Sequence, residues 1–333
     1  MMVIPPFELV KPSSLMEALQ RLAENPGALP IAGGTDLLVS MKHRLFHPRI
    51  IVDLKGAPDL KRMEITGAGA WLGACLRLSQ LNQHPELRQR YRALSQAASV
   101  VASPPLQNRG TLGGNVCLDT RCWYYNQSAF WRKSRGYCLK REGDICQAAR
   151  GSKRCYATFS SDTAPALIAL GARVTLARWH ENRLVERELP LEDLYVEDGI
   201  KRNVLLPGEI VVGLALPSAQ KTLRSGYCKY RQRKSIDYPL VSLAVALQVV
   251  DGKLKDVRVV VGAMASAPIL AHDSMAALEG SYVNPDLLDH ASELVTKGTR
   301  PVKNQASSPA YRRHMARTLF RRLLEEIVNE PGV

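Results

Sequence analysis

The cysteines are the residues of this chain whose type and spacing most directly suggest chemistry. Five of the seven fall within one aromatic and basic stretch, CLDTRCWYYNQSAFWRKSRGYCLKREGDICQAARGSKRC, which covers residues 117–155. Disulfides, a zinc site or an iron–sulfur cluster could each use such a group of thiols. The sequence begins without the pattern of a signal peptide, so we expect a cytoplasmic, reducing location. Clustered cysteines there bind metal more often than they form disulfides, and the odd total also fits a disulfide framework poorly.

Positive charge is concentrated in the same stretch. The formal net charge is +14, and residues 118–155 hold nine Lys and Arg against three acidic residues. A second basic run, RRHMARTLFRR, begins at Arg312. Basic surfaces attract acidic proteins or nucleic acids. No helix-turn-helix, zinc-finger or RNP-type pattern accompanies the charge, so we expect no nucleic-acid partner. No stretch approaches the ~20 apolar residues of a membrane span, so we expect no membrane partner.

The order of apolar patterns predicts an α+β protein with mixed sheets and at least two domains. ALPIAGGTDLLVSMKHRLF is typical of a strand, a glycine turn and a helix, and RIIVDLKG of a further strand. Composition turns polar in PSAQKTLRSG, residues 217–226, where we place a domain boundary. Three strands are expected beyond it, the last two joined at Asp251–Gly252, a dipeptide that favours hairpin turns. Helical patterns then continue toward the C-terminus.

Two short glycine loops could bind an anionic ligand. They are AGGTD, Ala32–Asp36, and TLGGN, Thr111–Asn115, and each follows an apolar run. Paired glycines let backbone N–H groups approach a ligand closely, and a helix N-terminus nearby favours phosphate. Neither loop matches the GxGxxG or GxxxxGK[ST] pattern, and a single loop of this kind would be a plain turn. The pair together suggests a dinucleotide pyrophosphate held between them.

The order of IAGGTDLL, NRGTLGGN and SDTAPAL resembles the FAD-binding medium subunit of the molybdenum hydroxylases. That family includes xanthine dehydrogenase, carbon monoxide dehydrogenase and 4-hydroxybenzoyl-CoA reductase, and the resemblance covers nearly the whole chain. It implies an FAD-binding domain over residues 1–217, made of a small βαβ-type subdomain and a mixed-sheet subdomain. It also implies a C-terminal domain over residues 218–333, with a three-stranded antiparallel sheet and helices, like that of the carbon monoxide dehydrogenase flavoprotein.

The resemblance also implies, position by position, which residues contact FAD. In the first loop these are Ala32, Gly33, Gly34, Thr35 and Asp36, which would hold the pyrophosphate. In the second loop they are Thr111, Gly113, Gly114 and Asn115. Asp162 is expected near the ribityl or adenosine end of FAD. Its position also fits an N-cap of the helix expected over TAPALIAL. Leu206 and Lys229 match positions that line the flavin.

The cysteine stretch is an insertion relative to ordinary members of that family. About 40 extra residues, 117–156, separate the GGN loop from the SD-AP segment. They resemble a loop of the 4-hydroxybenzoyl-CoA reductase β subunit that binds a [4Fe–4S] cluster. The ligands that this resemblance implies are Cys122, Cys138, Cys146 and Cys155. Four thiolates suit such a cluster, whereas the spacing lacks the close cysteine pairs of zinc ribbons. Cys117 is left over and is expected beneath the flavin loop.

These expectations combine into an electron-transfer subunit that carries FAD and a [4Fe–4S] cluster and no catalytic residue of its own. The resemblance implies a heterohexamer in which partner subunits hold the molybdopterin site and [2Fe–2S] clusters. It favours reductive dehydroxylation of 4-hydroxybenzoyl-CoA, with electrons from an acidic ferredoxin. An oxidising molybdenum hydroxylase is the alternative within the family. A zinc-stabilised, basic nucleic-acid-binding protein is the alternative outside catalysis.

Overall fold

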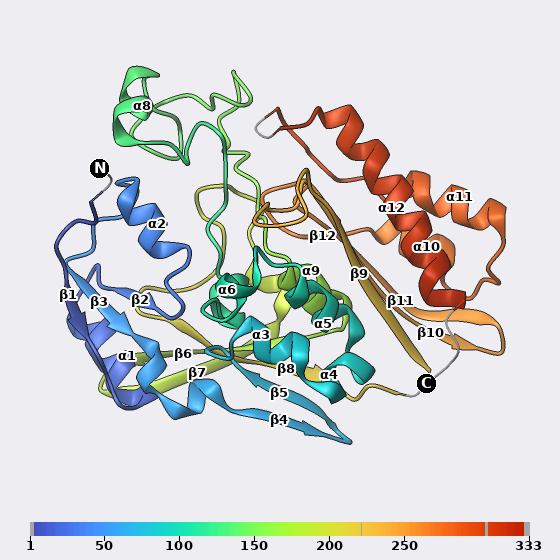
Figure 1. The fold of residues 1–333 in the computed structure, drawn as a ribbon, viewed down its shortest axis with the longest axis horizontal. Helices are drawn as coiled ribbons and strands as arrows, with labels where there is room; N and C mark the ends of the chain where they lie inside the picture. The colour runs from blue at the N-terminus through green and yellow to red at the C-terminus, as the bar shows by residue number, and fades with distance from the viewer. Residues whose placement is uncertain (1–2, 221, 304–305, 330–333) are drawn as a thin grey trace.

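The structure is a computed structural model that describes residues 3–220, 222–303 and 306–329. It begins with a small parallel sheet of strand order β1-β3-β2 (Figure 1). The hydroxyl of Ser14 accepts a hydrogen bond from the Glu17 N–H and caps the first helix, whose apolar face packs on this sheet and on β6. The βαβ-type subdomain expected from the sequence is therefore present. Its elements are β1 (Glu8–Val10), α1 (Leu15–Glu24), β2 (Leu29–Ile31), α2 (Leu37–Lys42) and β3 (Ile50–Asp53), followed by the 3-10 turns η1 (Leu54–Gly56) and η2 (Pro58–Lys61).

A five-stranded sheet of order β4-β5-β8-β6-β7 forms the second part of the FAD-binding region. All of its strand pairs are antiparallel, so the region as a whole combines parallel and antiparallel sheets. The β6–β7 hairpin turns at Glu181–Asn182, where both residues adopt positive φ angles. The strands are β4 (Met63–Thr66), β5 (Gly69–Gly73), β6 (Arg173–His180), β7 (Arg183–Pro190) and β8 (Ile210–Pro217), with the 3-10 turn η3 (Leu191–Leu194) after β7.

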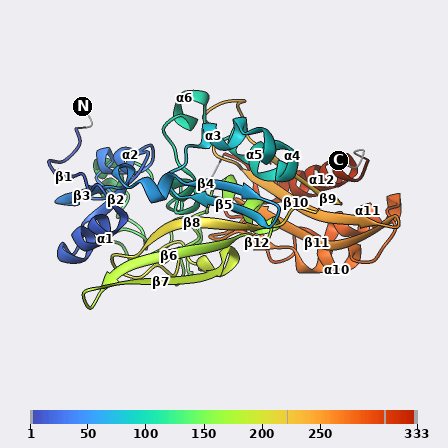
Figure 2. The ribbon, with the colours of Figure 1, turned by 90° about the horizontal axis from the view of Figure 1, so that it is seen from below.

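Short helices connect β5 to the cysteine stretch and lie along one side of this sheet (Figure 2). Two of them, α4 and α6, begin at proline, which fits the first turn of a helix because its missing N–H is not needed there. They are α3 (Leu78–Gln83), α4 (Pro85–Arg90), α5 (Arg92–Ser99), α6 (Pro104–Gln107) and α7 (Leu112–Val116).

The C-terminal domain is an antiparallel sheet of order β12-β11-β10-β9 with helices on one face. Its three long strands match the expected three-stranded sheet, and Asp251 and Gly252 form the expected hairpin turn with positive φ at both residues. The two-residue strand β12 adds an edge that is too short to carry a sequence pattern. The elements are β9 (Leu223–Tyr230), β10 (Val241–Val250), β11 (Lys253–Gly262), β12 (Ile269–Leu270), α10 (His272–Leu278), α11 (Pro285–Leu294) and α12 (Pro309–Asn329).

One hydrophobic core joins the two domains. Helix α5 and helix α9 (Thr163–Ala169) pack against β9, β10 and β11. Leu72 and Leu214 of the five-stranded sheet belong to the same buried cluster as Ala244 and Val260 of the C-terminal sheet. Burial of apolar surface on this scale holds the domains in one fixed arrangement. Residues contributed by both domains can therefore form one site.

The cysteine stretch leaves this framework as a separate loop with one short helix, α8 (Ala129–Ser134), at the top of Figure 1. Its base is closed by a backbone bridge in which Arg121 and Thr158 exchange two hydrogen bonds of 2.7 Å. The bridge fixes both ends of the loop on the FAD-binding domain. No described helix of the chain is long and apolar enough to cross a membrane.

Candidate functional site

The first glycine loop lies directly against the two residues that precede the second, Arg109 and Gly110. A Cβ atom at Gly33 would lie 2.2 Å from the carbonyl oxygen of Arg109, so no side chain fits there. Gly34 has a φ of +74°, in the region that favours glycine. A Cβ atom at Gly110 would lie 3.7 Å from Thr35 Oγ1. The fold therefore brings together the two loops that were expected to share a pyrophosphate.

The glycines of the second loop also serve the packing of the protein itself. Thr111 caps α7, and its Oγ1 accepts a hydrogen bond of 3.2 Å from the Gly114 N–H. The Gly113 N–H donates to the Ala74 carbonyl at 2.8 Å, and a Cβ atom on Gly113 would lie 2.7 Å from the Ala74 Cβ. These two N–H groups are already bonded within the fold. Gly113 is thus a close-packing glycine, a role that the sequence pattern did not predict.

Asn115 connects the second glycine loop to the start of α9. Its Oδ1 accepts hydrogen bonds from Ser161 Oγ at 2.7 Å, from the Thr163 N–H at 3.0 Å and from Thr163 Oγ1 at 2.7 Å. Three donors to one oxygen fix both segments relative to each other. Asp162, which lies between the donors, is held beside the second loop as a result.

Asp162 does not cap α9 with its side chain, although the sequence allowed that role. Its carboxylate instead accepts a hydrogen bond of 2.6 Å from the Tyr227 hydroxyl and forms an ion pair of 3.0 Å with Lys229 Nζ. Burial raises the pKa of Asp162, although the Lys229 ammonium opposes the shift, and burial likewise lowers the pKa of Lys229. Two of the expected flavin residues, Asp162 and Lys229, therefore contact each other across the domain boundary.

Arg121 occupies the space between the first glycine loop and the C-terminal domain. Its guanidinium forms an ion pair with the Asp36 carboxylate and lies 4.1 Å from the centre of the Tyr238 ring. Burial raises the pKa of Asp36, and the Arg121 charge opposes this shift without reversing it. Arg121 also lines a cavity of about 300 Å³ together with Tyr238, Cys122 and Ser160. Arg121 Nε and Ser160 Oγ are buried polar atoms for which the structure shows no hydrogen-bond partner among the described residues.

Leu206 is 42% exposed and is positioned by a local turn. Its backbone N–H donates to Glu209 Oε2 at 3.0 Å, and Glu209 in turn receives two hydrogen bonds of 2.7 Å from the Arg187 guanidinium. These contacts fix the backbone of Leu206 at the start of β8. Its expected place beside the flavin stays a prediction.

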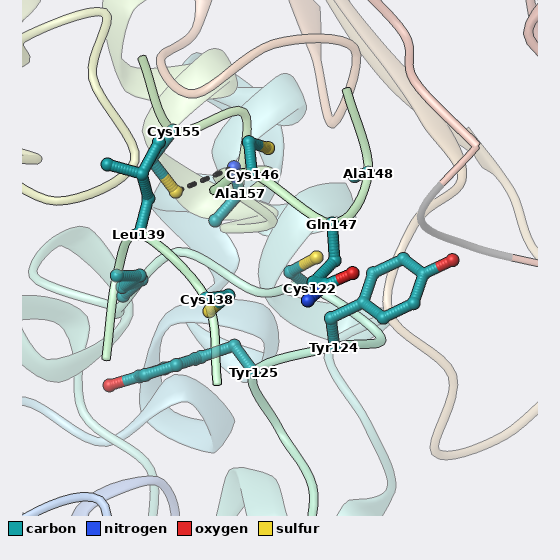
Figure 3. Close-up of a pocket in the computed structure, with 11 residues that line it drawn as sticks. Cys122, Tyr124, Tyr125, Cys138, Leu139, Cys146, Gln147, Ala148, Cys155 and Ala157 are labelled. Atoms are coloured by element: carbon teal, nitrogen blue, oxygen red, sulfur yellow. Dashed lines mark hydrogen bonds between the residues drawn. The ribbon is translucent and has the colours of Figure 1, made fainter. Parts of the chain in front are cut away.

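One small cavity of the insert is lined by all four cysteines that were implied as cluster ligands (Figure 3). They are Cys122, Cys138, Cys146 and Cys155. The last three are buried and Cys122 is half-buried. Tyr124, Tyr125 and Leu139 supply much of the remaining wall. Cys122 also lines the larger cavity beside Arg121. The insert has little regular structure, yet it brings four cysteines that are spread over 33 positions of the sequence to one cavity.

Backbone groups approach two of these cysteines closely. A Cβ atom at Gly199 would lie 2.5 Å from Cys155 Sγ, and one at Gly143 would lie 2.7 Å from the Cys138 nitrogen. The Ala157 N–H lies 3.4 Å from Cys155 Sγ as a hydrogen-bond donor. Hydrogen bonds to sulfur are one way in which proteins adjust iron–sulfur clusters. Gly199 comes from the segment after η3, so a region outside the insert also shapes this cavity.

The donor set matches a [4Fe–4S] cluster in number and element. Burial raises the pKa of Cys122 to about 12 and that of Cys155 to about 11, so both are protonated thiols at neutral pH unless a metal replaces the proton. Among the described residues, no three His, Cys, Asp or Glu side chains form a group that could hold a single metal ion. The thiols therefore surround a common space without closing on one point.

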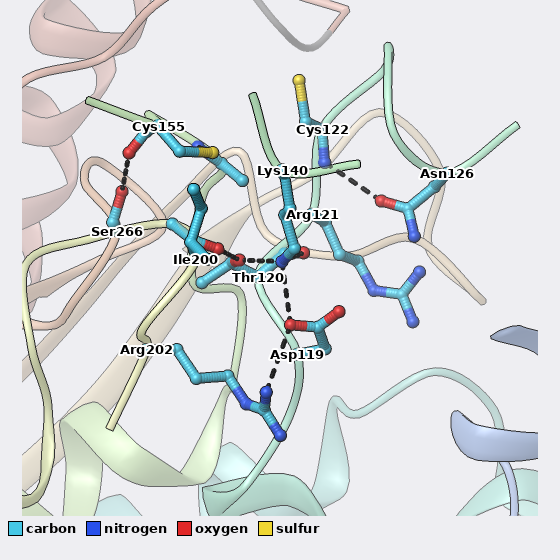
Figure 4. Close-up of polar contacts among 12 residues, drawn as sticks. Asp119, Thr120, Arg121, Cys122, Asn126, Lys140, Cys155, Ile200, Arg202 and Ser266 are labelled. Atoms are coloured by element: carbon cyan, nitrogen blue, oxygen red, sulfur yellow. Dashed lines mark hydrogen bonds and ion pairs between the residues drawn. The ribbon is translucent and has the colours of Figure 1, made fainter. Parts of the chain in front are cut away.

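A buried cation lies against the same cavity (Figure 4). Lys140 lines it, and its ammonium donates to Asp119 Oδ1 at 2.8 Å and to the Thr120 carbonyl at 2.9 Å. Arg202 lies 3.5 Å from the same Asp119 oxygen. Burial lowers the pKa of Lys140 while Asp119 raises it. Sequence patterns gave no sign of this group, because its members come from three separate segments.

The remaining cysteines lie away from the thiol cavity. Cys117 ends α7, where its N–H donates to the Gly113 carbonyl at 2.8 Å, and its side chain packs against the main core. Burial raises the pKa of Cys117 to about 11. Cys75 is buried and Cys228 is half-buried. Cys117 thus directly follows the second glycine loop and packs on the core, and its expected place beneath the flavin loop stays a prediction.

The fold and the paired glycine loops together define a flavoprotein with a distinct C-terminal domain. Comparison with known families bears this out. Residues 5–219 match the FAD-binding domain of molybdopterin dehydrogenases, and residues 226–327 match the C-terminal domain of the carbon monoxide dehydrogenase flavoprotein. The chain belongs to the FAD-binding medium subunits of the molybdenum hydroxylase family.

Several characterised proteins are similar in sequence. The aldehyde oxidoreductase FAD-binding subunit PaoB of Escherichia coli K12 is 36% identical over 252 residues, which cover 73% of this chain and 76% of that protein. The nicotine 6-hydroxylase medium subunit of Paenarthrobacter nicotinovorans is 26% identical, with 98% of each chain covered. Their names describe subunits of an aldehyde oxidoreductase and of a nicotine hydroxylase, and neither is a 4-hydroxybenzoyl-CoA reductase.

Solved structures confirm the fold. A chain of the carbon monoxide dehydrogenase from Oligotropha carboxidovorans superposes with a TM-score of 0.80 at 22% identity, covering 99% of this chain and 100% of that one. A chain of quinoline 2-oxidoreductase from Pseudomonas putida 86 gives a TM-score of 0.77 at 23% identity, covering 98% of each chain. At this level of identity the likeness extends to the fold alone. The expected α+β architecture is correct.

Proposed function

We propose that this chain is the electron-transfer subunit of a molybdenum-containing oxidoreductase and carries a [4Fe–4S] cluster in addition to FAD. The observation that carries the proposal is the convergence of Cys122, Cys138, Cys146 and Cys155 on one cavity. A cluster takes one thiolate per iron and so spaces its ligands more widely than a single ion does. Four thiols suit a [4Fe–4S] cluster in number and element, and their spacing lacks the close cysteine pairs of zinc ribbons.

The residues of the chain would bind and shield the two cofactors. In the proposed arrangement, the two glycine loops and Asp162, Leu206 and Lys229 hold FAD, while Asn115 keeps the second loop and α9 together. The aromatic wall of the thiol cavity excludes water from the cluster. When bound, a flavin exchanges one- and two-electron steps, and an iron–sulfur cluster transfers single electrons. Cys122 would hold the cluster and also lines the larger cavity beside Arg121.

The substrate and the direction of the reaction are properties of the whole complex and not of this chain alone. In this proposal a large molybdopterin subunit and a small [2Fe–2S] subunit complete a heterohexamer, and an acidic ferredoxin exchanges electrons with the cluster. We favour oxidation of an aldehyde or a similar substrate, because the 36% identical relative is named as an aldehyde oxidoreductase subunit. Reductive dehydroxylation of an aromatic acyl-CoA is the second candidate. It depends on the resemblance of the cysteine stretch and stays a prediction.

The test is metal and flavin analysis of the anaerobically purified complex, compared with a complex in which Cys138 and Cys146 are both replaced by serine. The proposal expects the variant to lose about four iron and four sulfide per chain and to keep its FAD. Equal iron in both complexes would overturn the cluster, and zinc lost in place of iron would support a zinc site instead. Assays with an aldehyde and an electron acceptor, and with an aromatic acyl-CoA and reduced ferredoxin, then distinguish the two reactions.

A further inference from the structure

Lys140 is a cation held in a fixed position at the wall of the thiol cavity. Its side chain is 6% exposed, and its ammonium is bonded to Asp119 Oδ1 at 2.8 Å and to the Thr120 carbonyl at 2.9 Å. The same ammonium lies 4.4 Å from the centre of the Tyr125 ring. The Thr120 hydroxyl oxygen also accepts from this ammonium, and three acceptors and an aromatic face leave a flexible lysine little freedom to turn toward solvent.

The charges around Lys140 do not cancel. Asp119 is the carboxylate of the group and is 9% exposed, but it faces two cations, Lys140 and Arg202. One negative and two positive charges leave a positive balance beside the thiols. A charge that is kept from water is weakly screened, so it acts on neighbouring groups more strongly than a surface charge does.

We infer that Lys140 stabilises the reduced state of the [4Fe–4S] cluster and so raises its midpoint potential. The inference depends on the proposed function, since it requires the cluster. Reduction adds one negative charge to the cluster, and a fixed ammonium at the cavity wall lowers the energy of that added charge. Asp119 limits the effect and fixes the ammonium in place. Lys140 is therefore a tuning residue, while the cysteines bind the metal.

Arg141 provides a matched control, because it is the next residue and carries the same charge. Its guanidinium pairs with the exposed Glu142 at 2.9 Å and is 31% exposed itself, and Arg141 is not part of the cavity wall. The experiment is a redox titration of the complex followed by the cluster's EPR signal. We expect Lys140→Met to make reduction about tenfold less favourable, which is a shift of about 59 mV to lower potential. We expect Arg141→Met to change the midpoint potential much less. Lys140→Arg keeps the positive charge, so its midpoint potential should stay close to that of the wild type.

A second variant keeps the test decisive if Lys140→Met fails to incorporate the cluster. Asp119→Asn retains the ammonium and removes the neighbouring negative charge, so it should move the potential upward. Equal shifts in Lys140→Met and Arg141→Met, or a downward shift in Asp119→Asn, would overturn the inference. Absence of iron and sulfide from the wild-type complex would instead overturn the proposed function, so the two failures are distinguishable.

Discussion

The guanidinium of Arg121 pairs with the carboxylate of Asp36, and this contact links the first glycine loop to the residue that directly precedes Cys122. The two partners are 85 positions apart in the sequence. Tyr238 of the C-terminal domain lies against the same guanidinium. One side chain thus contacts the region proposed for FAD, the base of the cysteine insert and the second domain.

Replacement of Arg121 by glutamine should weaken FAD binding. Asp36 carries a negative charge beside the proposed position of the anionic pyrophosphate, and Arg121 neutralises it. Loss of one charge-assisted contact of this kind costs about 1–3 kcal/mol, so we expect roughly a tenfold increase in the FAD dissociation constant. Equilibrium dialysis of the complex against FAD measures this dissociation constant.

Arg141→Gln is the control for this experiment, since it removes an equal charge from the same insert. Its partner, Glu142, is its sequence neighbour and is exposed. Flavin affinity should be unchanged in this variant. Equal loss of FAD in both variants would mean that the overall charge of the insert, and not the contact with Asp36, supports binding.

Gly33→Ala should destabilise the first glycine loop. The new methyl group would lie 2.2 Å from the Arg109 carbonyl oxygen, and a backbone atom cannot move aside as a flexible side chain can. Overpacking of this kind costs about 1–3 kcal/mol, and the FAD content should fall with it. Gly67→Ala is the matched control, because a Cβ atom at Gly67 has no heavy atom within 4 Å. Thermal unfolding and flavin absorbance check both variants, and an unaffected Gly33→Ala would show that the loops are not packed as described.

Serine at Cys138 should remove the iron–sulfur signal, whereas serine at Cys117 should leave it unchanged. Cys138 lines the thiol cavity, and Cys117 packs against the core directly after the second glycine loop. Iron, labile sulfide and the EPR spectrum of the reduced complex provide the comparison. A cluster that survives Cys138→Ser and disappears in Cys117→Ser would show that the ligand set is wrong.

Local patterns were sufficient for much of the fold. The glycine turns, the alternation of strands and helices and the Asp251–Gly252 hairpin depend on neighbouring residues, so the sequence displays them directly. The order of the motifs was enough to predict the α+β architecture.

Long-range contacts could not be predicted in this way. The bond between Lys140 and Asp119 and the pair of Lys229 with Asp162 join segments that only the folded chain brings together. Gly113 packs against Ala74, the residue after β5, a contact that its sequence neighbours do not reveal, and its expected place beside FAD stays a prediction. Pairwise contacts of this kind depend on tertiary geometry, which no local pattern encodes.

Electron exchange between the insert and an acidic carrier protein should slow with added salt. Lys133 and Arg135 are exposed at the end of α8, and Phe130 on the same helix is 83% exposed. A basic surface accelerates encounter with an acidic partner, and the effect falls steeply as ionic strength rises. Stopped-flow rates with ferredoxin between low and high salt measure it. Lys133→Gln combined with Arg135→Gln should flatten the dependence, and a rate in the wild type that is independent of salt would exclude steering.

Glu209 should make the stability of the chain depend on pH in the acidic range. Burial tends to raise the pKa of this carboxyl, but hydrogen bonds from Arg187 and from the Leu206 N–H outweigh it and hold the pKa below its ordinary value of 4.5. A carboxyl whose pKa is lowered by folding stabilises the folded state above its unfolded pKa. That contribution is lost as the pH falls through the folded pKa.

Glu209→Gln should therefore lower the free energy of unfolding at pH 7 by about 1–3 kcal/mol, because the buried end of the Arg187 contact loses its charge. The difference from the wild type should shrink as the pH falls below the ordinary pKa of the carboxyl. Urea denaturation of wild type and variant between pH 7 and pH 3 measures the trend, since the folded pKa of Glu209 lies below 4.5. Glu186→Gln, an exposed change on the same strand as Arg187, should stay within about 0.5 kcal/mol of wild type throughout. A constant difference between Glu209→Gln and wild type across the range would mean that packing around Leu206, and not the charge of Glu209, holds the start of β8.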